Sequence, residues 1–111
     1  MKITIDILKK NKARTELLDY FTTTFSWDAE VDVYEFIAQI HKDKKNFSHW
    51  LYRKFKLSGI CERFYGNGGI NYRQYCKDGK FHGFGEYFYK NRGVRHRGNY
   101  KDGVLIDKFL N

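Results

Sequence analysis

A histidine between two arginines is the feature of this sequence that most resembles a catalytic group. His96 stands between Arg95 and Arg97, and Glu86 lies ten positions earlier. Such a set could serve a small ribonuclease, in which a histidine or glutamate acts as base and arginine stabilises charge on phosphorus. A glutamate and an arginine recur elsewhere at the same spacing, and a recurring ion pair is more simply structural. We therefore expect no catalytic residue and no enzymatic activity.

The candidate metal ligands are two cysteines and two histidines of the second half, Cys61, Cys76, His82 and His96. They form no Cys-x-x-Cys motif, and no two histidines stand at ligand spacing. We expect no metal and no cofactor. The N-terminus lacks a signal-like apolar run, so we expect a cytoplasmic protein with free thiols. A disulfide between the cysteines is the less favoured alternative.

Basic and aromatic residues are the groups that predict binding. The net charge is +8 and 19% of residues are aromatic. Residues 1–55 carry ten basic and eight acidic residues, whereas residues 56–111 carry eleven and five. The second half therefore supplies most of the positive charge, which favours an anionic partner. The predicted binding residues are Arg53, Arg63, Phe64, Arg73, Phe88, Arg92, Arg95 and Arg97.

Three functions are compatible with this set. Arginine and aromatic side chains are enriched at the energetic centres of protein interfaces, so protein binding is our leading expectation. Basic residues interleaved with aromatic rings also suit single-stranded nucleic acid, so direct nucleic-acid binding is the alternative. A small ribonuclease or toxin is the third. We expect no membrane binding, because the chain has no dense lysine and arginine cluster.

Helices are predicted to fill residues 4–55. Apolar residues recur there at helical intervals, and Thr4 and either Asp28 or Asp32 are suited to the start of a helix. The predicted segments are residues 4–10, 13–23, 31–41 and 46–55.

Short strands are predicted to fill the second half. Tyrosine, phenylalanine and glycine dominate there, and Asn-Gly or Asp-Gly turn signals return about every dozen residues. The pattern predicts a five-strand antiparallel meander, with strands near residues 60–66, 69–76, 84–90, 93–100 and 104–109.

An internal repeat of 24 residues underlies these strands. Nine of the 20 residues in 62–81 are identical to the residue 24 positions later, among them Phe64 and Phe88. Two-residue loops would make Glu62 face Arg73 and Glu86 face Arg97. The same register places Tyr65, Ile70, Tyr72, Tyr87, Tyr89 and Val94 on one mostly apolar face, and Phe64, Phe88, Arg95 and the two Glu–Arg pairs on the other. A three-residue loop would shift this register.

Residues 86–93 (EYFYKNRG) and 98–103 (GNYKDG) resemble the bacterial variant of the MORN repeat. Residues 61–83 are a more diverged copy, so the resemblance covers about residues 59–107. It implies tandem β-hairpins that act as an interaction scaffold, in some family members at anionic lipids; bacterial versions are often described as antitoxin-like. Residues 1–55 are similar to a short helical module that precedes repeats in some phage and bacterial proteins.

Together these observations predict an α+β protein in which N-terminal helices (1–55) pack on one face of a β-meander of hairpin repeats (56–111). A stripe formed by Phe64 and Phe88 would be the binding surface, unless the helices cover it. Trp27 and Trp50 are expected to pack on the sheet. The expected function is a regulator or inhibitor encoded by a phage or mobile element that binds a host complex, in one form an anti-CRISPR protein.

Overall fold

The structure is a computed structural model that describes residues 1–110. It divides into a unit from Met1 to Gln39 and a unit that begins at Ile40. The expected boundary was residue 55. The division falls earlier because the last helix belongs to the same unit as the sheet.

The first unit is a small helical fold with one two-residue strand pair. Its elements are β1 (Lys2–Ile3), α1 (Ile5–Lys10), α2 (Thr15–Thr24), β2 (Val31–Asp32) and the start of α3 (Val33–Lys42). Thr4 Oγ1 accepts a hydrogen bond from the Ile7 N–H, as its predicted role at a helix start requires. Asp32 similarly accepts from two N–H groups of the first turn of α3. The core contains Phe21 and Phe36, whose rings meet edge to face.

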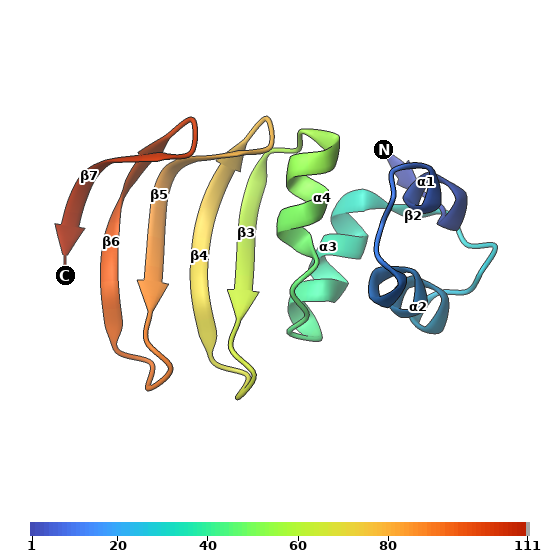
Figure 1. Ribbon diagram of the computed structural model, residues 1–111, viewed down its shortest axis with the longest axis horizontal. Coiled ribbons are helices and arrows are strands. Elements are labelled where there is room, and N and C mark those ends of the chain that lie inside the picture. Colours follow the sequence, from blue (N-terminus) through green and yellow to red (C-terminus); the bar gives the residue numbers. More distant parts are fainter. Residues whose placement is uncertain (111) are drawn as a thin grey trace. The chain divides into compact units, whose positions relative to one another are not determined.

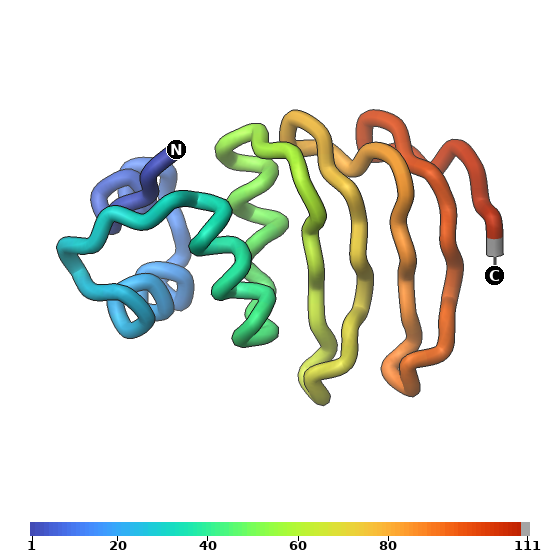
Figure 2. Tube along the Cα trace, turned by 180° about the vertical axis from the view of Figure 1, so that it is seen from behind, coloured from blue at the N-terminus to red at the C-terminus, as the bar shows by residue number. Residues whose placement is uncertain are grey.

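The second unit contains one helix and the predicted five-strand antiparallel sheet, which confirms the α+β class (Figure 1). Its elements are α4 (Ser48–Phe55), β3 (Gly59–Phe64), β4 (Ile70–Lys77), β5 (Lys80–Phe88), β6 (Val94–Lys101) and β7 (Val104–Leu110). The strands follow one another in sequence order. The turns at residues 65–69 and 89–93 therefore lie at the same end of the sheet (Figure 2).

Helix α4 lies along the outer edge of β3, and this corrects the expectation that a helix covers a face of the sheet (Figure 1). Side chains of α4 and of the segment before it hydrogen-bond to alternate residues of that edge: Asn46 to Phe64, Ser48 to Glu62 and Tyr52 to Ile60. These bonds satisfy backbone groups that an edge strand leaves unpaired. The first edge of the sheet is thus closed by side chains, whereas β7 forms the other edge.

The predicted register is confirmed in the middle of both hairpins, where Glu62 pairs with Arg73 and Glu86 with Arg97. It is wrong near the turns, because Asn71 and Arg95 are extra residues at β-bulges. Phe64 consequently pairs with Ile70 and Phe88 with Val94. These four apolar residues share the face that carries the two Glu–Arg pairs, here called the Glu–Arg face.

The opposite face, here called the tyrosine face, carries stacked rings. Tyr72 and Tyr87 are buried, with ring centroids 5.3 Å apart, and His96 stacks on Tyr87 at 4.4 Å. Gln74 is fully buried beneath them and accepts a hydrogen bond from the Tyr87 hydroxyl at 2.8 Å. Contacts between neighbouring strands therefore bury much of this face, and His49 of α4 adds to them by stacking on Phe81 at 5.0 Å.

The two tryptophans do not pack as expected. Trp27 is 74% exposed, and Trp50 contacts the ring of Phe55 in its own helix. Among the residues that the structure describes, no helix is long and apolar enough to cross a membrane.

Candidate binding site

A hollow of about 360 Å³ opens on the Glu–Arg face near the turns that end β3 and β5. We call it the Phe64 hollow; it is lined by Lys44, Phe64, Gly68, Gly69, Ile70, Phe88 and Arg92. Three of these, Phe64, Phe88 and Arg92, belong to the predicted binding set. The structure thus brings together two aromatic rings and one arginine that lie up to 28 positions apart in sequence.

The two phenylalanines of the hollow occupy equivalent positions in the two repeats. They lie on β3 and β5, so two strand spacings of roughly 4.8 Å put their backbones about 10 Å apart. The bulge at Asn71 turns Ile70 onto the same face, between the two rings. The floor of the hollow is therefore apolar because of a bulge that the repeat pattern did not reveal.

Arg92 on the rim has an unusual backbone conformation. Its φ is 72°, in the left-handed region, and the equivalent residue of the first repeat is Gly68, with φ 84°. The two turns are otherwise alike, since each ends with a glycine whose N–H donates to the preceding asparagine side chain. A residue with a Cβ is less stable in this region than glycine by about 1–2 kcal/mol. Such local strain is concentrated at functional sites in proteins.

Lys44 supplies the second cation of the rim, and sequence reasoning missed it. It follows α3 and also has a left-handed φ, of 56°. Within residues 1–110, neither Lys44 nor Arg92 forms an ion pair with a carboxylate. The lysines at residues 42–45 were the only feature of the sequence that could have indicated Lys44 as a binding residue. They do not show which strand lies nearby.

The other predicted binding residues do not join this hollow. Arg73 and Arg97 pair with Glu62 and Glu86 on the same face, at 3.6 and 2.8 Å. Arg63 pairs with a residue of the tyrosine face, and Arg95 lies 5.9 Å from the centre of the Tyr87 ring. Arg53 is exposed on α4. The predicted set is therefore divided between two faces and a helix, and Arg95 is the arginine of the set that stands at a bulge.

A second cluster has the connectivity of a serine–histidine–glutamate triad. His41 places Nε2 2.9 Å from Ser48 Oγ and Nδ1 3.3 Å from Glu62 Oε1. Ser48 is completely buried, however, and its hydroxyl donates to the Glu62 carbonyl on the edge of β3. A nucleophile must contact its substrate, and the buried Ser48 hydroxyl is not accessible to one. The hydrogen bonds of this cluster instead satisfy backbone groups on the edge of β3.

His41 is held as a neutral ring. Its Nε2 accepts the Glu62 backbone N–H at 3.3 Å, which assigns the ring proton to Nδ1, facing the Glu62 carboxylate. Burial lowers the pKa of His41 and the charge of Arg73 lowers it further, against the opposing effect of Glu62. The contact between His41 and Glu62 is therefore a hydrogen bond of a neutral histidine.

This arrangement predicts a pH-dependent stability. The folded pKa of His41 lies below the unfolded value of about 6.5, so the unfolded chain binds more protons between these two values. The contribution of His41 to the free energy of unfolding should have its full value above about pH 6.5 and should fall as the pH drops through that window. In His41→Gln, we expect a shallower dependence, by up to about 1.4 kcal/mol per pH unit, in urea titrations at several pH values. An unchanged slope would contradict the assignment.

The catalytic alternative built on His96 is not supported by its position. His96 projects on the tyrosine face, where its Nε2 lies 3.1 Å from the Tyr100 hydroxyl, while Glu86 pairs with Arg97 on the opposite face. Cys61 and Cys76 are buried free thiols, and the hydrogen bond to Cys61 together with burial raises the pKa of Cys76. No group of three or more metal-ligating side chains occurs within the described part of the chain.

Exposed apolar residues on the open edge of the sheet were also missed. On β7 they are Val104, Leu105, Ile106 and Phe109, and Phe109 stacks with exposed Phe84 of β5. The apolar residues of such a strand predict a place in the core, because the sequence does not show that the strand lies at the unpaired edge of the sheet.

Comparisons with protein-family models, with curated proteins and with solved structures each gave no match. The resemblance to MORN repeats accordingly stays a prediction from the sequence.

Proposed function

We propose that this chain is a non-enzymatic binding protein that holds a partner protein at the Phe64 hollow. The observation that carries the proposal is the pairing of an apolar floor with two cations, Lys44 and Arg92, which both have a left-handed backbone and form no ion pair within residues 1–110. Aromatic and arginine side chains dominate the energetic centres of protein interfaces. The partner would present an apolar side chain beside a carboxylate.

The absence of catalysis is part of this proposal. Its support is the complete burial of Ser48 and the placement of His96 and Glu86 on opposite faces. In its narrower form, the proposal is a phage- or mobile-element-encoded regulator that inhibits a host nucleoprotein such as a CRISPR–Cas complex. Small size, positive charge and the resemblance to bacterial repeat modules support that form.

Replacing Arg92 by glycine is the direct test of this site. The substitution restores the turn residue of the first repeat, so relief of left-handed strain offsets the greater flexibility of glycine. We expect an unchanged or slightly higher melting temperature together with at least about tenfold weaker binding, because an interface arginine is lost. Lys90→Gln is the matched control, since it removes one charge from the same turn region without altering the hollow.

The measurement is capture of partners from nuclease-treated bacterial lysate by immobilised wild-type, Arg92→Gly and Lys90→Gln chains. The proposal is supported if a discrete protein is recovered at fixed stoichiometry by wild-type and Lys90→Gln and is lost from Arg92→Gly. Equal recovery by all three chains, or recovery that disappears after nuclease treatment, would show that the Phe64 hollow does not bind the partner.

A further inference from the structure

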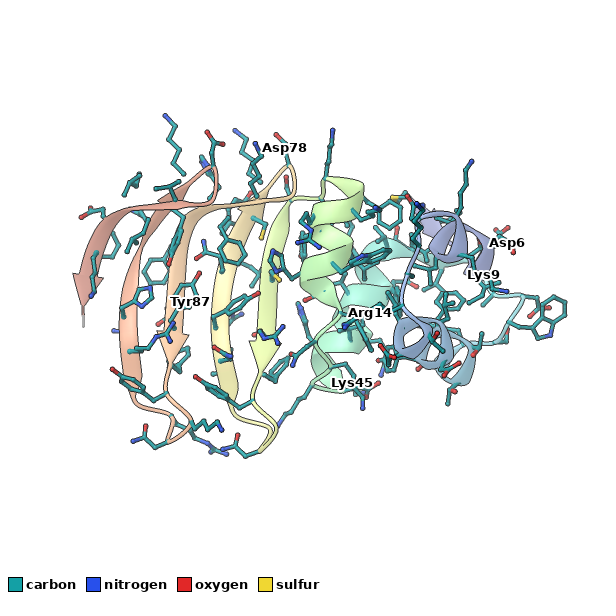
Figure 3. The ribbon with its side chains drawn as sticks, viewed as in Figure 1. Asp6, Lys9, Arg14, Lys45, Asp78 and Tyr87 are labelled. Atoms are coloured by element: carbon teal, nitrogen blue, oxygen red, sulfur yellow. The ribbon has the colours of Figure 1, made fainter. Side chains whose placement is uncertain are left out.

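A second hollow, of about 480 Å³, lies at the end of the strands opposite the Phe64 hollow. We call it the lysine hollow; it is lined by Lys56, Lys77, Asp78, Lys80, His82, Lys101 and Asp102. Asp78 marks its position on the turn after β4 (Figure 3). Its volume is in the range of small-ligand sites.

The lysine hollow is built by the repeat. Lys56 and Lys80 are 24 positions apart, as are Lys77 and Lys101, and the same holds for the two aspartates. Equivalent residues of this sheet lie two strands apart, or about 10 Å. The hollow therefore presents two similar groups of lysines, one from each repeat, which adjoin where Lys77 faces Lys80 across β4 and β5.

Repeated backbone bonds hold these two groups in register. The Gly79 N–H donates to the Leu57 carbonyl at 2.9 Å, and the Gly103 N–H donates to the Phe81 carbonyl at 2.9 Å. The Asp78 N–H donates to Ser58 Oγ at 3.0 Å. Each turn is thereby fixed to the chain segment that precedes it, so the positions of the lysines are set before any ligand binds.

The charges of the hollow are unbalanced. Four lysines face two aspartates, and in residues 1–110 none of the four forms an ion pair. The cations are all lysines, which bind phosphate as compact point charges and do not require a bidentate geometry.

We propose that the lysine hollow binds a chain of phosphate groups, as found in inorganic polyphosphate or in the backbone of single-stranded nucleic acid. A phosphate chain can contact lysines along the whole row from Lys56 to Lys101, whereas a single phosphate contacts at most a neighbouring pair such as Lys77 and Lys80, which face each other across β4 and β5. The second contact is then intramolecular, which raises the affinity without new chemistry. This site is separate from the Phe64 hollow and does not depend on the function proposed there.

The test is calorimetric titration of the whole chain with orthophosphate, tripolyphosphate and oligothymidylate at equal ionic strength. We expect tripolyphosphate to bind at least about tenfold more tightly than orthophosphate, because it contacts more of these lysines. If tripolyphosphate displaces the oligonucleotide, the two share the site. Binding of only one of them identifies the source of the phosphate chain. No binding of either, or equal affinity for orthophosphate, would overturn the proposal.

The variant that tests the site is Lys77→Gln/Lys101→Gln, which removes one exposed lysine from each group. We expect at least about tenfold weaker binding, and a salt dependence of oligonucleotide affinity that is shallower by roughly 0.7 for each lost contact. The control Lys90→Gln/Lys108→Gln removes the same charge from the same unit outside the hollow. An equal loss in both variants would mean that the net charge, and not this hollow, attracts the anion. A melting curve of each variant verifies folding.

Discussion

Replacing Gly79 by alanine is expected to lower the free energy of unfolding by about 3–5 kcal/mol, which is a large fraction of the net stability of an ordinary domain. Gly79 has φ 82°, where a Cβ costs about 1–2 kcal/mol. A Cβ there would also lie 2.9 Å from the Tyr52 carbonyl oxygen and 3.1 Å from Lys56 Cα. These are backbone atoms of α4 and of the residue that ends it, so no side-chain rotation relieves the overlap.

The repeat provides a matched control for this substitution. Gly103 occupies the equivalent turn with φ 85°, but a Cβ there meets nothing within 4 Å. Gly103→Ala should therefore cost only the conformational part, about 1–2 kcal/mol. Urea denaturation of both variants measures the difference. Equal losses would show that contact with α4 adds nothing at Gly79, and that the helix is not seated on this turn.

Replacing Gly85 by alanine is the second substitution with a large expected effect, about 2–4 kcal/mol. A Cβ at this position would overlap the side-chain amide of Gln74. That amide is fully buried; it donates to the carbonyls of Tyr75, Gly83 and Phe84 and accepts from the Tyr87 hydroxyl (Figure 3 shows Tyr87 on β5). Displacing it leaves buried polar groups without partners, and each of these costs about 1–3 kcal/mol.

A double-mutant cycle distinguishes this cause from a general intolerance of alanine in the strand. Gln74→Ala removes the overlapping amide, so Gly85→Ala should cost less in that background, by at least about 1 kcal/mol. Gly66→Ala serves as the reference, because a Cβ there meets nothing within 4 Å. Additive losses in the cycle would rule out the contact between Gln74 and residue 85 as the reason for the glycine.

The number, type and order of the long elements follow from local patterns. The four helices and five long strands occur where the helical spacing and the turn dipeptides place them, with ends that differ by a few residues. The largest difference is at β5, which begins at Lys80 instead of residue 84. Its early start follows from a two-residue turn at Asp78 and Gly79, which leaves no room for a longer connection.

The candidate site could be predicted only in part. Phe64 and Phe88 were recognisable from the repeat, because equivalent positions of a meander fall on the same face, and Arg92 was predicted from its charge in an aromatic-rich region. Ile70 was assigned to the wrong face, since one extra residue in a strand reverses the side chains beyond it. Lys44 was not recognised, because its place beside Gly68 depends on how the segment after α3 meets the sheet.

The sequence by itself determined the α+β class, the meander and the 24-residue repeat, because side-chain period and turn chemistry act between residues that are close along the chain. Only the tertiary structure decided which residues share a surface. His41 reaches Ser48 and Glu62 through the closed edge of β3, and the lysines of two repeats gather at one end of the strands. These groupings depend on bulges and on side-chain hydrogen bonds to an edge strand, which no spacing in the sequence specifies.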